Sequence, residues 1–191
     1  ANRLYVQRGI HDAFVARLSE RMGALSIGPG TDPASQCGAM INQASIDKIT
    51  RLVDDAVERG AEVKLGGQVL DRPGFFFPPS VLGNVQPGSE LLSTEIFGPV
   101  AAVVPFDDPD EAVELANATE YGLAAYVFSG DLKRALRLAE RIECGMVAVN
   151  RGLVSDAAAP FGGVKQSGLG REGSHHGLLE YCEAKYIAVS W

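Results

Sequence analysis

The sequence lacks several features that would each have indicated a particular class of protein. Its longest apolar runs fall far short of the roughly 20 residues that a transmembrane helix needs, and its first residues show no charged segment followed by an apolar signal core. Basic residues are outnumbered, since 17 Lys and Arg face 24 Asp and Glu for a net charge of −7. No basic patch stands out. We therefore expect neither a membrane span nor a nucleic-acid partner.

Cysteine is scarce as well, and the three copies, Cys37, Cys144 and Cys182, are widely spaced along the chain. An odd number at such spacing fits neither a disulfide framework nor a zinc site. We expect small buried thiols rather than nucleophiles, no metal site and a reducing, cytoplasmic setting. We also expect no dinucleotide-binding phosphate loop in this chain.

Hydrophobic residues make up 46% of the 191 residues, which is ample for a packed core. Apolar spacing predicts five helices, at residues 11–22, 43–58, 109–118, 132–142 and 172–183. Short apolar runs predict strands at residues 4–6, 63–65, 81–82, 100–106, 124–128, 146–149 and 184–191. Strands that alternate with ten-residue helices indicate an α/β fold with a mostly parallel sheet.

Four of these segments allow a finer prediction. The first helix should bury a stripe of Phe14, Leu18 and Met22, and the second should bury Ile46, Ile49, Val53, Ala56 and Val57. The double proline before residues 81–82 favours an edge strand or an extended lead-in over a central strand. Residues 184–191 carry apolar side chains on both faces, which suits a strand covered by another subunit.

The stretch 94–100, Thr-Glu-Ile-Phe-Gly-Pro-Val, organises the functional argument. Glu95 could accept hydrogen bonds from hydroxyls such as a ribose diol, and Phe97 could pack against a flat heterocycle. Taken alone, the stretch is more simply interpreted as a loop carboxylate beside a core phenylalanine. A second stretch, Pro-Phe-Gly-Gly-Val-Lys-Gln-Ser-Gly at residues 160–168, is glycine-rich and must be irregular.

Together with Tyr-Gly-Leu-Ala at 121–124 and Gly-Met-Val-Ala-Val-Asn at 145–150, these stretches resemble the C-terminal part of NAD(P)-dependent aldehyde dehydrogenases. The order and spacing agree over essentially all of the chain. The segments 152–155 and 168–173 are most similar to the succinate-semialdehyde dehydrogenases. The resemblance implies a three-layer, mostly parallel α/β fold. It also implies that residues 1–183 form the C-terminal portion of the catalytic domain and residues 184–191 an oligomerisation strand.

The resemblance also assigns roles to single residues. Glu95 would bind the nicotinamide ribose and Phe97 would pack near the nicotinamide of NAD or NADP. Ser155 would bind the distal carboxylate of the aldehyde substrate, and Phe161 would line its tunnel. Lys48 lies where some relatives touch the cofactor, although a solvated helix lysine is the simpler interpretation.

No catalytic residue is expected in this chain, because the family's nucleophilic cysteine lies just before the segment that matches residues 1–6. The first residues read as the middle of a strand, so the chain is expected to begin inside a larger protein and to be inactive alone. Arg151 could face either a substrate carboxylate or solvent. The predicted parent oxidises succinate semialdehyde and assembles as a homo-oligomer through residues 184–191. The alternatives are another semialdehyde, such as glutarate semialdehyde, or a non-catalytic assembly or binding module of the same fold.

Overall fold

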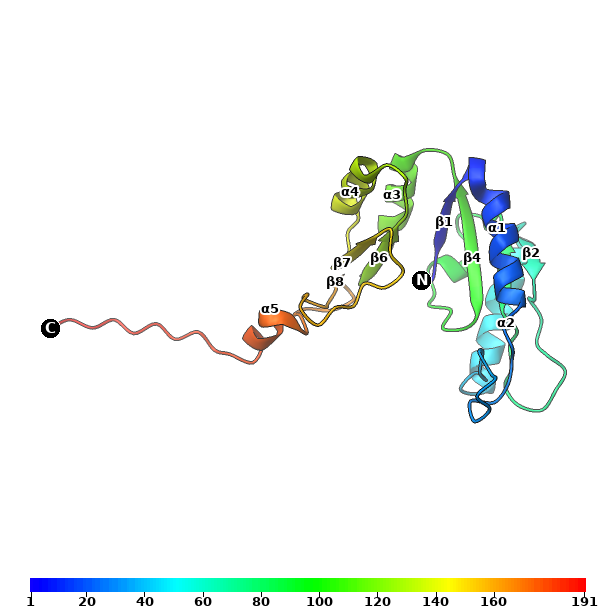
Figure 1. Cartoon of the computed structure of the whole chain (residues 1–191), viewed down its shortest axis with the longest axis horizontal. Helices are drawn as coiled ribbons and strands as arrows, with labels where there is room; N and C mark the ends of the chain where they lie inside the picture. Colours follow the sequence, from blue (N-terminus) through cyan, green and yellow to red (C-terminus); the bar gives the residue numbers. More distant parts are fainter. The chain divides into compact units, whose positions relative to one another are not determined.

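The computed structural model describes all residues from 1 to 191, and the chain divides into two compact units, Ala1–Ala112 and Val113–Trp191. Figure 1 shows the elements of each unit coloured along the sequence. No linker stands out in the sequence at this boundary, which falls inside helix α3 (Pro109–Asn117). None of the helices combines the length and the apolar composition that a membrane span requires.

The first unit is built on a four-stranded sheet in the order β1-β4-β3-β2. Its strands are β1 (Leu4–Gln7), β4 (Val100–Phe106), β3 (Ser80–Gly83) and β2 (Glu62–Leu65). β4 is parallel to both β1 and β3, and only β2 is antiparallel to its neighbour. The prediction of a mostly parallel sheet is therefore confirmed for this unit.

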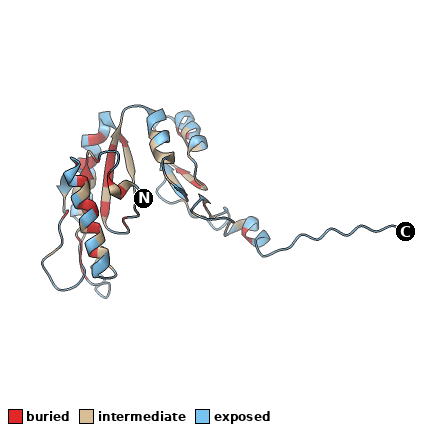
Figure 2. Cartoon of the chain, turned by 180° about the vertical axis from the view of Figure 1, so that it is seen from behind, coloured by how far each residue is buried: buried red, intermediate tan, exposed pale blue.

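Two helices bury the two faces of that sheet, α1 (Arg8–Gly23) and α2 (Gln43–Glu58). Alternate residues along a strand point to opposite faces, and the buried residues divide in that way. Ala102 and Val104 of β4 join the apolar cluster of α2, whereas Val103 joins the cluster that contains Val15 of α1. The buried and exposed sides of α2 can be followed in Figure 2.

Helix α2 occupies the predicted residues, and its ends have the predicted caps. The Asn42 side chain accepts a hydrogen bond from the Ser45 backbone N–H, and Gly60 adopts a left-handed φ of 103° just beyond the helix. Such a cap satisfies one of the four free N–H groups at a helix start. The predicted core face was wrong at two residues, because Leu52 was left out and is buried, whereas Val57 was included and is exposed.

The predicted stripe on α1 was also wrong in part. Phe14 is exposed, and the helix buries His11 and Val15, with Leu18 and Met22 partly buried behind them. These four residues are spaced four, three and four apart, which is the repeat of one helix face. His11 was passed over because a polar ring is a poor sequence signal for burial.

Strand β3 is not an edge strand, since it lies between β4 and β2 and all four of its residues are buried. The double proline acts instead as the extended lead-in that the sequence left open. Pro78 and Pro79 precede the strand, so their missing N–H groups remove no ladder hydrogen bond from it.

The second unit contains two small strand pairs. β6 (Ala124–Val127) pairs in parallel with β7 (Met146–Val149), and helix α4 (Leu132–Arg141) connects them. β5 (Tyr121–Gly122) pairs antiparallel with β8 (Val164–Lys165). This βαβ unit agrees with the predicted alternation of strands and helices. The arrangement of the whole chain in three layers stays a prediction.

The end of the chain differs most from expectation. Helix α5 covers only Ser174–Leu179, and residues 184–191 are exposed and form no strand. The helix cannot begin at Glu172, because the backbone N–H and C=O of Glu172 both pair with Phe161. Residues 184–191 have no strand partner within the chain, so their backbone has no ladder to join.

The core predicts a large difference between two isoleucines. Ile49 is 0% exposed in the α2 cluster, whereas Ile41 is 81% exposed. We expect Ile49→Ala to lower the free energy of unfolding by about 2–5 kcal/mol, as expected for a large-to-small core substitution. Ile41→Ala, the matched control, should change it by less than about 0.5 kcal/mol. Denaturant unfolding of both variants measures the difference, and equal effects would contradict this assignment of the core.

Candidate functional site

Glu95 and Phe97 lie in the loop that joins the short 3-10 helix η1 (Glu90–Leu92) to β4. Both side chains are exposed, and Phe97 retains 75% of its surface. Ile96, between them, is only 3% exposed and belongs to the α2 cluster. The loop is therefore anchored by its middle residue and displays a carboxylate and an aromatic ring outward. The interpretation of Phe97 as a core phenylalanine is wrong.

The backbone at this point is unusual for an L-residue. Phe97 has a φ of 49°, in the left-handed region, which costs of the order of 1 kcal/mol for a residue with a Cβ. The next residue, Gly98, packs against α2 so closely that an added Cβ would lie 2.3 Å from Ile49 Cδ1. The turn thus needs glycine beside the helix, and the buried neighbours hold Phe97 in its strained conformation.

Lys48 contacts this loop from α2, because its Nζ donates a hydrogen bond to the backbone carbonyl of Glu95 at 3.1 Å. The side chain is half-buried rather than fully solvated. Asn2 contacts the same loop from the residues before β1. Sequence reasoning missed Asn2, because a residue read as the start of a strand gives no signal of a contact more than 90 positions away.

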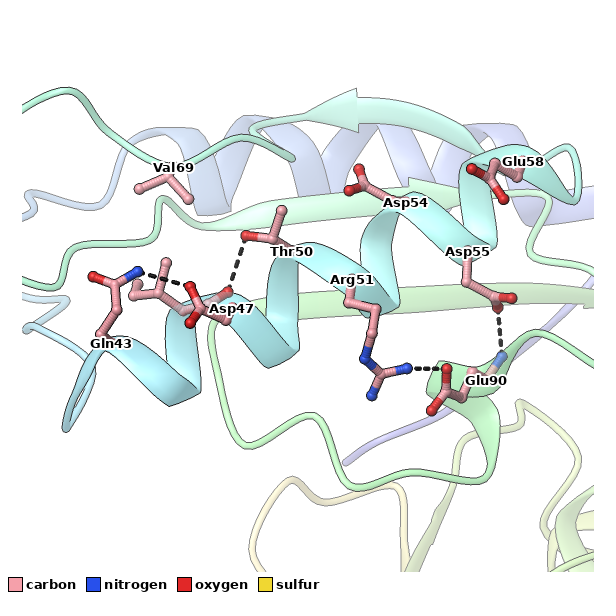
Figure 3. A pocket seen from close by; sticks show the side chains of 10 residues that line it. Gln43, Asp47, Thr50, Arg51, Asp54, Asp55, Glu58, Val69 and Glu90 are labelled. Carbon is pink, nitrogen blue, oxygen red and sulfur yellow. Dashed lines mark hydrogen bonds and ion pairs between the residues drawn. The ribbon is translucent and has the colours of Figure 1, made fainter.

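Polar side chains of α2 also contact Glu90 in η1, just before this loop (Figure 3). Asp55 accepts hydrogen bonds from the Glu90 backbone N–H at 2.7 Å and from Arg59 Nε at 2.8 Å. Arg51 forms an ion pair with the Glu90 carboxylate. The hydrogen bond from the Glu90 N–H is the largest cause that lowers the pKa of Asp55 below its ordinary value of 3.8, and the hydrogen bond from Arg59 is the next. The hollow on this side includes neither Glu95 nor Phe97, so it is separate from the candidate site.

Ser155 and Phe161 lie in the second unit, on the segment that follows β7. Ser155 is exposed in the loop, and Phe161 is half-buried and pairs with Glu172 through two backbone hydrogen bonds of 2.7 and 2.8 Å. Arg151 is exposed. The loop begins at Asn150, whose side chain exchanges two 2.9 Å hydrogen bonds with the Ser129 backbone. That reciprocal contact fixes where the segment leaves the strand.

Gly162 and Gly163 of the 160–168 stretch lie where a side chain would not fit. A Cβ on Gly145 would lie 1.9 Å from the Gly162 carbonyl oxygen, and one on Gly162 would lie 2.6 Å from the Gly170 carbonyl oxygen. A Cβ on Gly163 would lie 2.5 Å from Ser167 Cβ. The backbones therefore approach more closely than any larger residue permits.

The glycines at 168, 170 and 173 match the letters of the Gly-x-Gly-x-x-Gly dinucleotide fingerprint, a match that sequence reasoning overlooked. The structure around these three glycines differs from that of a phosphate-binding loop. The preceding strand, β8, is antiparallel to its partner, and the following helix has six residues. The Glu180 carboxylate lies 3.2 Å from the Cβ position of Gly170 and accepts the Arg171 N–H. A carboxylate there would repel a phosphate.

The cysteines differ from the prediction of small buried residues. Cys182 is exposed, and Cys37 and Cys144 are half-buried. Burial raises the pKa of the Cys144 thiol, which donates a hydrogen bond to the Met146 carbonyl oxygen at 3.0 Å. A raised pKa lowers the thiolate fraction at neutral pH, so Cys144 is a poor nucleophile.

The structure thus places Glu95 and Phe97 in one loop of the first unit, and Ser155 and Phe161 on one segment of the second. The two residues of each pair therefore belong to the same unit.

The lowered pKa of Asp55 predicts a pH dependence. The stabilisation from its ionised form is complete above its ordinary pKa of 3.8 and is lost as the pH falls through the lower folded pKa. We expect Asp55→Asn, which keeps the size and an acceptor oxygen, to be less stable than the parent at pH 6. The difference should shrink steadily below pH 3.8.

The matched control for Asp55→Asn is Asp54→Asn, the neighbouring exposed carboxylate on α2. Denaturant unfolding between pH 2 and pH 7 measures both variants. A stability gap for Asp55→Asn that stays constant with pH, or an equal gap for Asp54→Asn, would contradict the assignment.

Comparison with known proteins places the chain among characterised relatives. The profile of the aldehyde dehydrogenase family matches residues 1–187. The chain is 52% identical over 190 residues to a succinate-semialdehyde dehydrogenase of Paenarthrobacter nicotinovorans, covering 100% of this chain and 42% of that protein. It is 42% identical over 190 residues to a glutarate-semialdehyde dehydrogenase of Pseudomonas putida, covering 100% of this chain and 39% of that protein.

Solved structures agree with these sequence relatives. A crystal structure of succinate-semialdehyde dehydrogenase from Burkholderia pseudomallei superposes with a TM-score of 0.92 at 44% identity, over 95% of this chain and 38% of that one. An NADP-dependent enzyme of E. coli superposes with a TM-score of 0.96 at 42% identity, over 100% of this chain and 40% of that one. The chain spans about two fifths of the length of the curated relatives it matches. With an α/β fold and a family profile that matches almost every residue, the chain belongs to the aldehyde dehydrogenase family.

Proposed function

We propose that the chain forms the C-terminal portion of an NAD(P)-dependent aldehyde dehydrogenase that oxidises succinate semialdehyde to succinate. The observation that carries the proposal is the 93–99 loop, where a buried Ile96 presents an exposed carboxylate and an exposed ring side by side. The names of relatives such as the Paenarthrobacter nicotinovorans enzyme support the substrate. The nucleophilic cysteine of such an enzyme would lie outside this chain.

In this function Glu95 holds the cofactor. Its side chain has no partner within the chain, so both carboxylate oxygens are available to accept hydrogen bonds from the two ribose hydroxyls. Each bond to the charged acceptor would contribute about 1.5–3 kcal/mol. Phe97 would pack beside the nicotinamide and limit its orientation. The cofactor supplies the hydride acceptor of the reaction.

The choice between NAD and NADP stays open in the proposal. A relative of Sinorhizobium fredii is named for NADP(+), whereas a solved betaine aldehyde dehydrogenase of Staphylococcus aureus at 38% identity holds NAD+. Glu95 and Phe97 would contact the nicotinamide half, which the two cofactors share. Discrimination at the 2′-position therefore belongs to other residues.

In the second unit, Ser155 would donate its hydroxyl proton to the distal carboxylate of the substrate, and Phe161 would line the path of the aldehyde. The relatives favour an anionic substrate, because one is named for glutarate semialdehyde and another, 45% identical, for 3-sulfolactaldehyde. Each of these aldehydes carries an acidic group. Glutarate semialdehyde is therefore the second candidate, and a substrate panel on the complete enzyme would distinguish the two.

The chain by itself is proposed to lack turnover. The reaction needs a thiolate, a base that activates water and a bound dinucleotide. Cys144 is a poor thiolate for the reason given above, and the glycines at 168–173 do not form a phosphate site. A non-catalytic assembly module of the same fold would share these features, and it differs in that the complete protein would also be inactive.

The apolar terminus belongs to the proposed assembly. Residues 184–191 expose Tyr186, Ile187, Val189 and Trp191 by 72% or more, and an exposed apolar strip of this kind suits a strand that a second subunit covers. We propose a homo-oligomer joined there. A cytoplasmic location is part of the proposal, although the relatives in mouse and rat are mitochondrial by name.

The role of Glu95 is tested by Glu95→Gln in the complete enzyme. Loss of the charged acceptor should lower turnover or raise the cofactor KM, with a combined loss in kcat/KM of about 10-fold or more, since each 1.4 kcal/mol corresponds to a factor of ten. Steady-state kinetics with varied cofactor measures the loss. The control is Glu140→Gln, an exposed glutamate on α4. Unchanged constants for Glu95→Gln in a folded enzyme would remove the role.

The role of Ser155 is tested by Ser155→Ala with two aldehydes of equal length. A lost hydrogen bond to a carboxylate costs about 1.5–3 kcal/mol, so the KM for succinate semialdehyde should rise about 10- to 150-fold. Butyraldehyde, which has four carbons and no carboxylate, serves as the internal control and should change little. An equal rise for both aldehydes would argue against carboxylate recognition.

A further inference from the structure

We propose that Asn2 is a positioning residue that locks the Glu95–Ile96 peptide and so sets the direction of the Glu95 carboxylate. The inference rests on the proposed role of Glu95 in cofactor binding. Asn2 belongs to none of the sequence motifs. Its side chain is not part of the proposed cofactor contact.

The Asn2 side chain makes three hydrogen bonds to one backbone segment. Its Nδ2 donates to the Leu91 carbonyl at 2.8 Å and to the Thr94 carbonyl at 3.1 Å, and its Oδ1 accepts from the Ile96 N–H at 2.8 Å. Two carbonyls and one N–H can be satisfied together by only one orientation of an amide. The partners therefore determine which way the amide points, and they fit asparagine better than any other residue of its size.

The location of Asn2 follows from the topology of the sheet. β1 and β4 are parallel neighbours, with Leu4 opposite Val103. The residues that precede the two strands meet at the same edge of the sheet, because parallel strands begin on the same side. Asn2 and residues 91–96 therefore meet although about 90 positions separate them.

The peptide between Glu95 and Ile96 is held from both sides. Asn2 Oδ1 accepts its N–H, and Lys48 Nζ donates to its carbonyl oxygen at 3.1 Å. A peptide unit is planar, so holding both polar atoms prevents the plane from rotating. Rotation of this plane would change the dihedrals on each side of it, and with them the directions of the side chains of Glu95 and Ile96.

The neighbours of this peptide leave it little freedom elsewhere. Leu91 is 0% exposed and Ile96 is 3% exposed, so the segment is fixed at two buried points. Between them Leu92 packs partly against the same core, whereas Ser93 and Glu95 are exposed. The polar contacts of Asn2 and Lys48 therefore constrain the exposed end of the segment, and the left-handed Phe97 follows directly after the locked peptide.

The first measurement needs no cofactor. Hydrogen exchange is followed at the Ile96 amide in the complete protein that carries this chain. We expect Asn2→Ala to accelerate exchange at Ile96 by 10-fold or more. Asn2→Asp keeps the acceptor for the Ile96 N–H but loses both donors and sets a carboxylate oxygen against the Leu91 and Thr94 carbonyls, so we expect it to accelerate exchange at Ile96 as well. It also serves as the test variant if Asn2→Ala fails to fold.

The matched control is Asn117→Ala, which removes two side-chain hydrogen bonds to backbone in the second unit, to the Glu143 N–H and the Arg141 carbonyl. It should leave exchange at Ile96 unchanged. Unaltered exchange in Asn2→Ala, or in Asn2→Asp where Asn2→Ala does not fold, would overturn the lock whatever the kinetics show.

The second measurement asks whether Asn2 acts through Glu95. In the complete enzyme, Asn2→Ala should lower kcat/KM for the cofactor at least 5-fold. In the Glu95→Gln background the same change should lower it less than 2-fold, because no carboxylate remains to be positioned. Multiplicative losses in the double variant would overturn action through Glu95. If Glu95→Gln left the kinetic constants unchanged, the proposed function would be contradicted. The exchange data would still decide whether Asn2 locks the peptide.

Discussion

The contact between Ile49 of α2 and the turn at Gly98 is the constraint on which the candidate site depends. An added Cβ on Gly98 would meet Ile49 Cδ1 at 2.3 Å, and Ile49 is completely buried. The helix therefore lies directly against the loop backbone. This contact holds the turn, and with it the left-handed Phe97, against the main core of the first unit. A site built on such support keeps its geometry better than one carried by a free loop.

Polar contacts add to the support that the core gives to this loop. Asp55 and Arg51 connect α2 to η1, and Lys48 connects it to the next residues of the same segment. Asn2 adds a contact from the strand edge. Exposed ion pairs contribute little to stability individually, so their value here is geometric. They restrict the path of the backbone from Glu90 to Ile96, which is the path that places Glu95.

Periodicity was sufficient to predict the elements but not the details of their packing. Helix α2 and strand β4 have the predicted limits, because each carries a strong and regular apolar pattern. Leu52 was missed, since helix spacing alone cannot decide between neighbouring positions at the border of a face, and His11 was missed because a polar ring gives little sequence signal for burial. The exposure of Phe97 was not readable either, because a phenylalanine next to a glycine-proline turn is found both in cores and in sites.

The sequence alone determined the α/β pattern, the glycines where backbones meet, and the family motifs that name Glu95, Phe97, Ser155 and Phe161. The pattern and the glycines follow from local chemistry, namely residue spacing, absent side chains and turn residues, whereas the four named residues come from the family resemblance. Tertiary structure decided that Ile96 is the anchor between two exposed residues, that Asn2 reaches across to it, and that Gly170 lies against the Glu180 carboxylate. It also left residues 184–191 without a strand partner. Each of these depends on which distant segment lies nearby, and no local pattern of residues encodes that neighbour.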